Sequence, residues 1–573
     1  MIKAPWLNFY DTVPYSLDYP DISMVGILES TCESYPNHTA YEFLGTKASY
    51  SEFLNEIHGC AKALKALGIE KGDRVTICLP NVPQAIIMFY AINLIGAISN
   101  MIHPLSSEGE IEFYIKDSNS VAAITLDAFY NRFENAIVNT NLKYLLITSI
   151  KDKLKPLKSI GFSLTKGRKI KPIPKSDGLI WWQDFLSSGD RYSLPYTTSI
   201  KGGDPAVILY SGGTTGTTKG ILLTNLNFNA LAMQTDAMGD CLSPGVSMLS
   251  IMPVFHGFGL GVGIHTMFLS ACKCILIPAF DAQTFGILLR KYRPNLIAGV
   301  PTLYEAMLKS QKMRGVDLSC LKGVFSGGDS LSVELKKKVD KFLKEHGATV
   351  QIREGYGTTE CVTASCLTPK NFARVGSIGL PFPDTYYKIV KPNTQEEIPY
   401  GYEGEICIHG PTVMLGYVGN PKETSHALQI HPDGLTWLHT GDLGYIDEDG
   451  FVYFKQRLKR MIISSGYSIY PSQLENIIDS HDAVLMSTVI GVDDPYKKQK
   501  VKAFIVLKPN ISPTKEIKES IKKHCEKNIV RYAMPYEFEY RESLPKTLVG
   551  KVAYTILEAE EREKEKSRQA ESR

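Results

Sequence analysis

Residues 50–352 alternate segments that have a helical apolar repeat with short runs that are rich in β-branched residues. An apolar repeat near 3.6 residues predicts helices, and the short runs predict strands. Strands that alternate with helices form a largely parallel sheet, because each helix returns the chain to the same edge. The predicted helices are 53–67, 83–98, 284–292 and 331–345, and the predicted strands are 74–79, 121–126, 296–300 and 350–352. The pattern therefore predicts an α/β fold.

The length of the chain and a change of pattern predict more than one domain. A chain of 573 residues exceeds what one hydrophobic core organises. At about 376–457, short strands between turns replace the alternation, which indicates a β-rich subdomain within a large N-terminal domain of residues 1–458. Residues 459–557 have the size and mixed pattern of a small α+β domain. The charged residues 558–573 predict a tail that is a frayed helix or disordered.

Composition excludes some classes of function. The 63 Lys and Arg nearly balance the 60 Asp and Glu, so the net charge of +3 gives no support to a nucleic-acid partner. The eleven cysteines form no CxxC pair, and their odd number, with the absence of a cleavable leader, favours a reducing cytoplasm without disulfides or a structural metal. The apolar segment 85–98 is shorter than the ~20 residues that span a bilayer, so we expect a core helix there.

The basic segment 151–175 has two interpretations. Many Lys and Arg surround small apolar clusters there, ahead of Ile180-Trp181-Trp182. Both a solvated insertion and a membrane-surface patch explain this composition. A peripheral membrane contact therefore stays open, as does a homodimer.

A Gly/Thr-rich loop between two predicted strands, 206–210 and 221–224, is the strongest chemical signal in the chain. Its glycines let backbone N–H groups approach phosphate oxygens, its hydroxyls donate hydrogen bonds, and Lys219 adds a positive charge. Two threonines separate Gly216 from Lys219, which excludes a Walker loop. An ordinary hairpin or linker is the alternative to the phosphate-binding loop that we predict. The candidate phosphate ligands are Ser211, Gly212, Gly213, Thr214, Thr215, Gly216, Thr217, Thr218 and Lys219.

Three further candidates lie on loops in the second half of the chain. Glu360 follows a predicted strand and the loop Gly355-Tyr356-Gly357-Thr358-Thr359, and one carboxylate is enough to hold Mg²⁺ against phosphates. Asp442 can accept hydrogen bonds from both ribose hydroxyls, although a turn Asp is the commoner interpretation. Arg457 lies just before the predicted domain join, where a guanidinium can bind phosphate; a solvated Arg is the alternative.

Lys551 and His256 also have candidate roles. Lys551 lies in a Pro/Gly turn with Lys546, and a solvated lysine is the ordinary interpretation. If the small domain closes over the phosphate loop, Lys551 can bring its charge to a carboxylate that attacks a phosphate. His256 lies among apolar residues and glycines, which suits a pocket wall or gate more than a general base. A satisfied core histidine is an equal alternative.

In this order and over nearly the whole chain, the motifs resemble those of the adenylate-forming superfamily, and most closely its long-chain fatty acid–CoA ligases. The resemblance rests on residues 210–220, 252–259, 326–328, 355–360, 440–442, 457–459, 465–471 and 551. It implies that a carboxylate attacks the α-phosphate of ATP to give acyl-AMP and pyrophosphate, and that the thiol of CoA then gives acyl-CoA and AMP. ATP, Mg²⁺ and CoA are the implied cofactors, and the small C-terminal domain is implied to be mobile between the steps.

The resemblance also implies roles for single residues. The implied catalytic residues are Lys551, Thr215, Lys219, Glu360 and Arg457. The implied metal ligands are Glu360 and Thr215, Lys459 is the implied hinge, and the implied acyl-binding residues are His256, Phe258, Gly299 and Val300. Ser465, Gly466 and Tyr467 would bind CoA. The ATP site would comprise Ser211 to Lys219 as above, with Gly327, Gly328, Asp329, Gly355, Tyr356, Gly357, Thr358, Thr359, Asp442, Arg457 and Lys551.

Some positions depart from the family pattern. Ser211-Gly212-Gly213 stands where many relatives have two serines and one glycine, and Glu354 stands where Gln or Asn is frequent. Residues 5–10 and the basic insertion favour a fatty acid over acetate or an aromatic acid. The alternatives are a fatty acyl-AMP ligase that loads the thiol of a carrier protein, and a non-catalytic relative that binds nucleotide or lipid.

Overall fold

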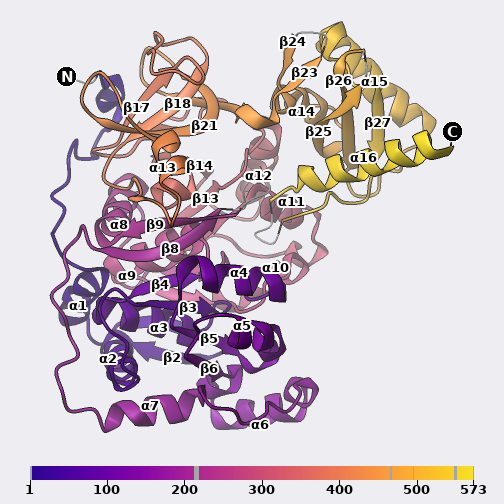
Figure 1. Ribbon diagram of the computed structural model, residues 1–573. Helices are drawn as coiled ribbons and strands as arrows, with labels where there is room; N and C mark the ends of the chain where they lie inside the picture. The colour runs from indigo at the N-terminus through magenta and orange to yellow at the C-terminus, as the bar shows by residue number, and fades with distance from the viewer. Residues whose placement is uncertain (1–2, 212–217, 465–466, 495, 548–550, 572–573) are drawn as a thin grey trace.

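The computed structural model describes residues 3–211, 218–464, 467–494, 496–547 and 551–571. Its helices and strands form a large N-terminal body and a smaller C-terminal unit, which are joined at residues 458–460 (Figure 1). Two large sheets in the body have parallel cores, while the other two sheets are smaller. The structure thus confirms the predicted fold class.

An eight-stranded sheet carries the ends of the predicted phosphate loop. Six strands from β8 to β7 are parallel, and β9 and β19 add antiparallel pairs at one edge. Ser211 lies opposite Lys219, so the loop joins neighbouring strands as predicted. Across the sheet the strands are β19 (Gly416–Tyr417), β9 (Lys219–Thr224), β8 (Pro205–Ser211), β4 (Ile98–Met101), β3 (Arg74–Cys78), β5 (Ala122–Leu126), β6 (Tyr144–Thr148) and β7 (Leu179–Trp181).

A nine-stranded sheet carries the predicted adenine segments. Its strands from β14 to β1 are parallel, and β2, β15 and β16 extend it with antiparallel pairs. Across the sheet the strands are β16 (Leu380–Pro381), β15 (Cys366–Leu367), β14 (Ile352–Tyr356), β13 (Gly323–Gly327), β12 (Leu296–Gly299), β10 (Ser247–Ser250), β11 (Lys273–Leu276), β1 (Thr39–Phe43) and β2 (Thr46–Ser49).

Helices pack on these sheets, and their sequences explain their positions. Every residue of α3 (Pro83–Leu94) is buried, which confirms the predicted core helix. A capping box between Ser49 and Glu52 begins α2 (Tyr50–Ala66). Within the described ranges, none of the helices combines the length and the apolar character that crossing a bilayer requires. The other helices of the body are α1 (Met24–Ser34), α4 (Glu108–Ser118), α5 (Glu134–Asn139), α6 (Pro156–Leu164), α7 (Trp182–Asp190), α8 (Asn225–Gly239), α9 (Thr266–Leu269), α10 (Phe285–Tyr292), α11 (Pro301–Lys309), α12 (Val333–Glu345) and α13 (Pro421–Ala427).

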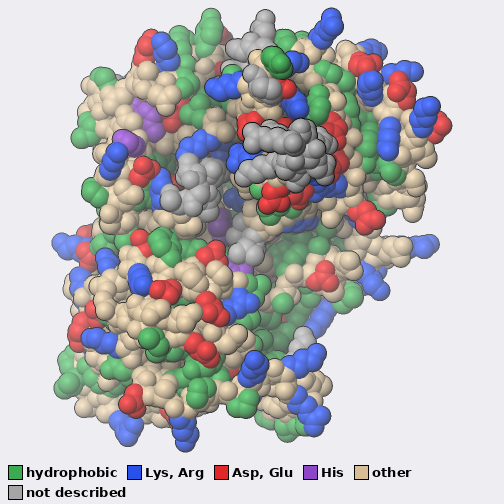
Figure 2. All heavy atoms as spheres, turned by 45° about the vertical axis from the view of Figure 1, so that its right-hand side comes forward, with side chains coloured by type: hydrophobic (Ala, Val, Ile, Leu, Met, Phe, Trp, Pro, Cys, Tyr) green, Lys and Arg blue, Asp and Glu red, His purple; other side chains and the backbone are tan. Residues whose placement is uncertain are grey.

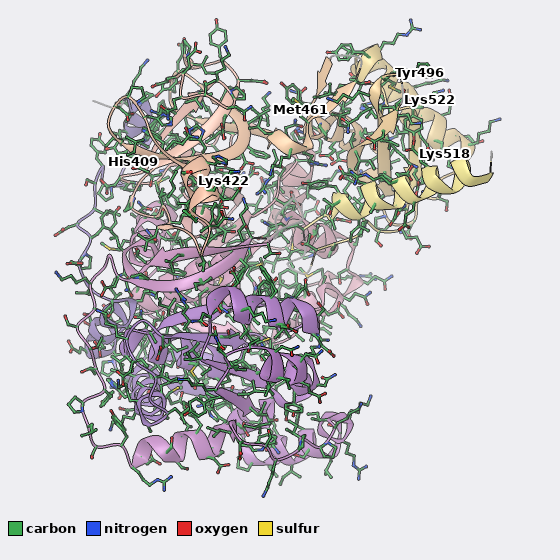
Figure 3. All side chains as sticks on the ribbon, viewed as in Figure 1. His409, Lys422, Met461, Tyr496, Lys518 and Lys522 are labelled. Carbon is green, nitrogen blue, oxygen red and sulfur yellow. The ribbon has the colours of Figure 1, made fainter. Side chains whose placement is uncertain are left out.

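A five-stranded antiparallel sheet lies at the top of the body, beside the C-terminal unit (Figure 1). Its strands are β17 (Tyr386–Val390), β18 (Gly404–His409), β21 (Thr436–Ile446), β20 (Leu428–Ile430) and β22 (Val452–Arg457). From the end of β22 the chain passes through the 3-10 turn Leu458–Arg460 and crosses to the C-terminal unit at Met461 (Figure 3).

The C-terminal unit packs helices on a sheet of its own. The strands are β24 (Tyr467–Ile469), β23 (Ile462–Ser464), β26 (Lys498–Leu507), β25 (Val484–Asp494) and β27 (Glu537–Tyr540), and the helices are α14 (Pro471–Asp479), α15 (Lys515–Asn528) and α16 (Tyr554–Glu571). Lys338 of α12 donates a hydrogen bond to the carbonyl of Val484 at 3.1 Å, which ties this unit to the body.

The end of the chain is helical, which is one of the two predicted alternatives, but the helix is not wholly exposed. Residues 554–571 form the single helix α16, which packs against β25. Leu557 and Glu561 are buried, and Glu561 lies 2.9 Å from the ammonium group of Lys502 on β26. The sequence did not predict the packing of α16, because only a few residues of this highly charged segment are buried.

Candidate active site

Asp442 is held on β21 with one carboxylate oxygen left without a hydrogen bond. Its Oδ2 accepts a hydrogen bond of 2.8 Å from the hydroxyl of Tyr356. Its Oδ1 lies 3.4 Å from Nε of Arg457, the residue opposite it on β22, and has no hydrogen-bond partner in the described chain. Only 2% of Asp442 is exposed, and burial raises the pKa of its carboxyl group while Arg457 lowers it. A buried acceptor without a donor is what the predicted ribose site requires.

Lys551 of the C-terminal unit reaches the same place. The backbone N–H of Val552 lies 3.4 Å from Oδ2 of Asp329, to which it donates, so the loop that carries Lys551 contacts the loop after β13. Burial lowers the pKa of Lys551, while the carboxylates of Asp329, Asp442 and Glu360 act in the opposite direction. The charge of Lys551 is therefore influenced by carboxylates that come from three separate segments.

Gly328 provides the space for this lysine. Its φ of +79° favours glycine, and a Cβ atom at this position would lie 3.3 Å from Cε of Lys551. A larger residue would strain the backbone and crowd the lysine.

The loops after β13 and β14 form the predicted adenine wall. Parallel neighbours in a sheet end at the same edge, and β13 ends at Gly327 while β14 ends at Tyr356. At Gly357 a Cβ atom would lie 2.4 Å from the carbonyl oxygen of Thr363, so no larger residue fits. The ends of these two strands and the loops after them contain Gly327, Gly328, Asp329, Gly355, Tyr356, Gly357, Thr358 and Thr359, the residues that the sequence analysis assigns to ATP.

Glu354, the unusual residue before this loop, also lies near the wall. Its Oε1 accepts a hydrogen bond of 3.2 Å from the backbone of Leu331. Burial raises the pKa of Glu354 to about 7, so its charge changes near neutral pH.

Lys219 has two partners that the sequence analysis did not find, and one of them, Tyr417, also contacts Glu360. Lys219 donates to the carboxylate of Glu423 on α13, and its ammonium lies 4.8 Å from the ring centre of Tyr417. The hydroxyl of Tyr417 donates to Oε1 of Glu360 at 2.9 Å. Oε2 of Glu360 accepts no hydrogen bond from any described residue, so it stays available to a ligand. A bound polyphosphate would have to replace Glu423 as the partner of Lys219.

An apolar cavity of about 60 Å³ adjoins the predicted adenine wall. Phe258 lines it, as do three glycines of the wall: Gly327, Gly328 and Gly355. Its other lining side chains are mostly apolar or sulfur-containing, and sulfur side chains adapt readily to different shapes. They include Met248, Val262, Met267, Leu296, Phe325, Cys366 and Phe382. The buried hydroxyl of Ser326, which has no hydrogen-bond partner in the described chain, also lines the cavity.

The other predicted acyl residues lie next to this cavity rather than along it. Val300 lies near Gly328, because a Cβ atom added at Gly328 would be 3.7 Å from its side chain. A Cβ atom added at Gly299 would meet the side chain of Leu303. The Nδ1 of His256 accepts a hydrogen bond of 3.2 Å from the backbone of Phe258. Burial and the charge of Lys551 lower the pKa of His256 to about 3, which leaves a neutral ring that cannot serve as a general base near pH 7.

Several predicted positions fall outside the described residues. They are Gly212, Gly213, Thr214, Thr215, Gly216 and Thr217 of the phosphate loop, and Ser465 and Gly466 of the predicted CoA site. Thr218 is described and precedes β9, while Tyr467 begins β24. Lys459 is exposed on the turn between the two units, where the hinge is expected.

The shape of the surface agrees with a site between the two units. Figure 2 shows this face hollowed between the body and the C-terminal unit, with Lys and Arg side chains around the hollow. Positive charge at such a hollow attracts anionic ligands.

Comparison with known proteins identifies two family models in the chain. The model described as AMP-binding enzyme matches residues 28–418, and the AMP-binding enzyme C-terminal domain matches residues 473–551. A long-chain-fatty-acid–CoA ligase of Bacillus subtilis is 35% identical over 98% of this chain and 99% of its own length. A ligase of the same description from Salmonella typhimurium is 31% identical over 98% of this chain and 99% of its own length.

Solved structures show the same fold. An anthranilate CoA ligase in complex with anthranoyl-AMP aligns with a TM-score of 0.81 at 24% identity, over 96% of this chain and 98% of the other.

Proposed function

The chain belongs to the family of AMP-binding enzymes, and from this premise we propose that it is a fatty acid–CoA ligase that carries out two reactions at the site between its two units. The observation that carries the proposal is that the segment of Lys551 contacts the loop after β13: Val552 donates to Asp329, and Lys551 lies against Gly328. Relatives with full-length similarity are long-chain-fatty-acid–CoA ligases, and the apolar lining of the cavity favours an apolar acyl group next to the nucleotide.

In the first reaction an oxygen of the fatty acid carboxylate attacks the α-phosphorus of ATP, and pyrophosphate leaves. Asp442 would accept hydrogen bonds from the ribose, and Arg457 beside it would contact a phosphate or the ribose. Lys551 would reduce the repulsion between the attacking carboxylate and the α-phosphate, which is the main electrostatic cost of this step. Lys219 would bind the leaving phosphates.

Glu360 has the chemistry that Mg²⁺ requires. A hard divalent cation binds carboxylate oxygens, and Oε2 of Glu360 accepts no hydrogen bond from the described residues. Mg²⁺ bound there would neutralise phosphate charge. Thr215, the second predicted ligand, lies outside the described residues and stays a prediction.

In the second reaction the sulfur of CoA attacks the acyl carbon, and AMP leaves. We propose that the C-terminal unit rotates about Lys459 between the reactions, so that Lys551 moves away and Ser465, Gly466 and Tyr467 line the path of CoA. The connection between the units is the short turn Leu458–Arg460, which supports a pivot at this point.

A panel of carboxylic acids tests the function. We expect pyrophosphate release with fatty acids, little with acetate or benzoate, and conversion of free CoA to acyl-CoA in the same assay. Acyl-AMP that accumulates while CoA stays unacylated would favour the carrier-loading alternative. Release of no pyrophosphate with any acid would favour the non-catalytic relative.

We further propose that the enzyme works in the cytoplasm and contacts an anionic membrane surface through α6. All eleven cysteines are free, which agrees with a reducing compartment. The apolar side chains of α6 face solvent: Leu157 is 85% exposed, and Ile160 and Leu164 are each 59% exposed. Their spacing places them on one face of the helix. No Asp or Glu occurs between residues 153 and 176, where Lys and Arg are frequent.

Replacement of Leu157, Ile160 and Leu164 by serine should weaken binding to vesicles that contain anionic lipid by roughly tenfold or more, because apolar burial and basic charge act together at a membrane surface. Cosedimentation with vesicles measures this. The control changes three other exposed apolar residues, Leu194, Ile287 and Ile430, to serine and should bind like the wild type. Equal binding by both triple variants would contradict a contact through α6.

A further inference from the structure

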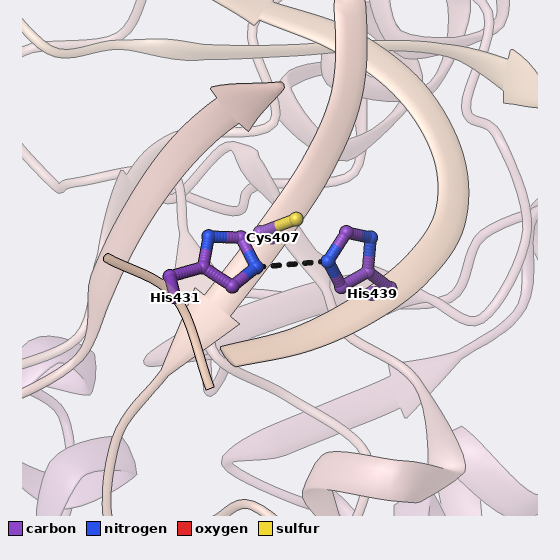
Figure 4. A group of neighbouring side chains, drawn as sticks. All are labelled: Cys407, His431 and His439. Atoms are coloured by element: carbon purple, nitrogen blue, oxygen red, sulfur yellow. Dashed lines mark hydrogen bonds between the residues drawn. The ribbon is translucent and has the colours of Figure 1, made fainter. Parts of the chain in front are cut away.

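Three side chains of types that can bind a metal meet in the antiparallel sheet, on strands next to the proposed nucleotide site (Figure 4). Cys407 lies on β18, His439 lies opposite it on β21, and His431 follows β20. Their ligand atoms all lie within 4.8 Å of one another, and the two Nε2 atoms are 2.9 Å apart. The three side chains point toward one common position (Figure 4).

The surroundings orient His439 as a ligand. Nδ1 of His439 lies 3.1 Å from Oε2 of Glu405. Because a carboxylate only accepts hydrogen bonds, it holds the proton on Nδ1 and leaves the lone pair of Nε2 directed at Cys407 and His431. The other oxygen of Glu405 accepts a hydrogen bond of 3.0 Å from the backbone of Gly441. A carboxylate behind a histidine is the usual outer partner in metal sites.

The cluster is shielded from solvent. Cys407 is 0% and His431 is 3% exposed, and the side chain of His439 is 6% exposed. Among the described residues, the thiol of Cys407 donates no hydrogen bond, although most other buried cysteines donate one. The indole of Trp437 lies against the ring of His431, with 6.0 Å between ring centres.

The charges around the cluster favour a cation. Glu405 and Asp433 each carry a negative charge, and Lys388 pairs with Asp433 at 2.9 Å. When the thiol of Cys407 is neutral, the charges of Glu405, Asp433 and Lys388 sum to one negative charge. A divalent ion bound to the thiolate adds one positive charge, so the buried group becomes neutral, which lowers the cost of burial.

We propose that Cys407, His431 and His439 form a binding site for Zn²⁺. One thiolate and two imidazoles are ligands that zinc prefers, and three protein ligands leave a fourth position for water. The expectation that the chain has no structural metal came from the absence of cysteine pairs, whereas this site uses one cysteine and two histidines.

The site would stabilise the segment that carries Asp442. His439 lies three residues before Asp442 on β21, and Thr440 between them donates to the carbonyl of Ile406 at 2.7 Å and accepts from the backbone of Asp442 at 3.1 Å. Zinc would therefore fix β18, β21 and the turn at His431 to one another beside the nucleotide site.

Zinc content and thermal unfolding of the full-length protein, measured without ATP or fatty acid, test the proposal independently of the proposed function. After incubation with Zn²⁺ and removal of free metal, we expect about one Zn²⁺ per chain. A strong chelator should lower the Tm of the wild type by several degrees, because a metal that binds only the folded state stabilises it. Cobalt in place of zinc should produce a thiolate-to-cobalt absorption band.

Two variants should lose zinc binding and the fall in Tm with chelator, and two control variants should keep both. Cys407→Ala and His431→Gln should bind Zn²⁺ roughly a hundredfold more weakly and lack the response to chelator. The matched controls are His409→Gln on the same strand and Cys525→Ala, a buried cysteine of the C-terminal unit, and both should bind Zn²⁺ and respond to chelator as the wild type does. If Cys407→Ala does not fold, two other results test the proposal. The wild type should show the thiolate-to-cobalt absorption band, and His431→Gln should bind Zn²⁺ more weakly. A wild type that holds no zinc, or binding that Cys407→Ala leaves unchanged, would overturn the proposal.

Discussion

Replacing Lys551 with alanine should reduce acyl-AMP formation by a factor on the order of 10²–10³, because removal of one preorganised charge from a developing transition state has an effect of this size. Thioester formation from supplied acyl-AMP and CoA should be largely retained. The reason is that Lys551 acts with the C-terminal unit in the orientation of this structure, in which its segment contacts the loop after β13. Pyrophosphate release and acyl-CoA formation, measured in separate assays, give the two rates.

The matched control for this variant is Lys546→Ala. Lys546 lies in the same turn but is exposed, and no described carboxylate pairs with it. It should retain both activities within about twofold. Equal losses of the two half-reactions in Lys551→Ala would contradict the assignment of this lysine to the first step.

Replacing Asp442 with alanine should raise the KM for ATP by roughly a hundredfold, because two charge-assisted hydrogen bonds to the ribose would be lost. The unpartnered Oδ1 of Asp442 is the structural reason for this expectation. Tyr356→Phe removes only the hydrogen bond that orients Oδ2, so its KM should rise by less than about tenfold. Steady-state kinetics with saturating fatty acid measures both values.

Glu448→Gln is the control for Asp442, because Glu448 lies in the exposed turn between β21 and β22. It should leave the KM for ATP unchanged. If Asp442→Ala binds ATP as tightly as this control, the ribose lies elsewhere and the assignment is wrong.

Local sequence patterns predicted much of the fold. The alternation of helices and strands predicted the α/β body because its period and breaks are local properties. The almost wholly apolar segment that became α3 is an example: its two polar residues form no polar face, so the helix is buried on all sides. The packing of the C-terminal helix was harder to predict. It depends on two buried residues, Leu557 and Glu561, in a segment that is otherwise highly charged.

The sequence analysis missed the parts of the site that depend on contacts between residues far apart in the sequence. Glu423 lies 204 positions from Lys219, and only the folded sheet brings α13 beside β9. The apolar cavity is formed by strands and loops from several parts of the chain, and Phe258 was the predicted acyl residue that lines it. Cys407, His431 and His439 have no regular ligand spacing, and the strand register places two of them opposite each other.

The central claim is that ATP and a fatty acid react at the junction of the two units. Exchange of labelled pyrophosphate into ATP, measured without CoA, tests it most directly because exchange requires reversible formation of acyl-AMP. The account predicts exchange that depends on a fatty acid and is abolished in Lys551→Ala. No exchange with any fatty acid, or equal exchange when the acid is omitted, would contradict it.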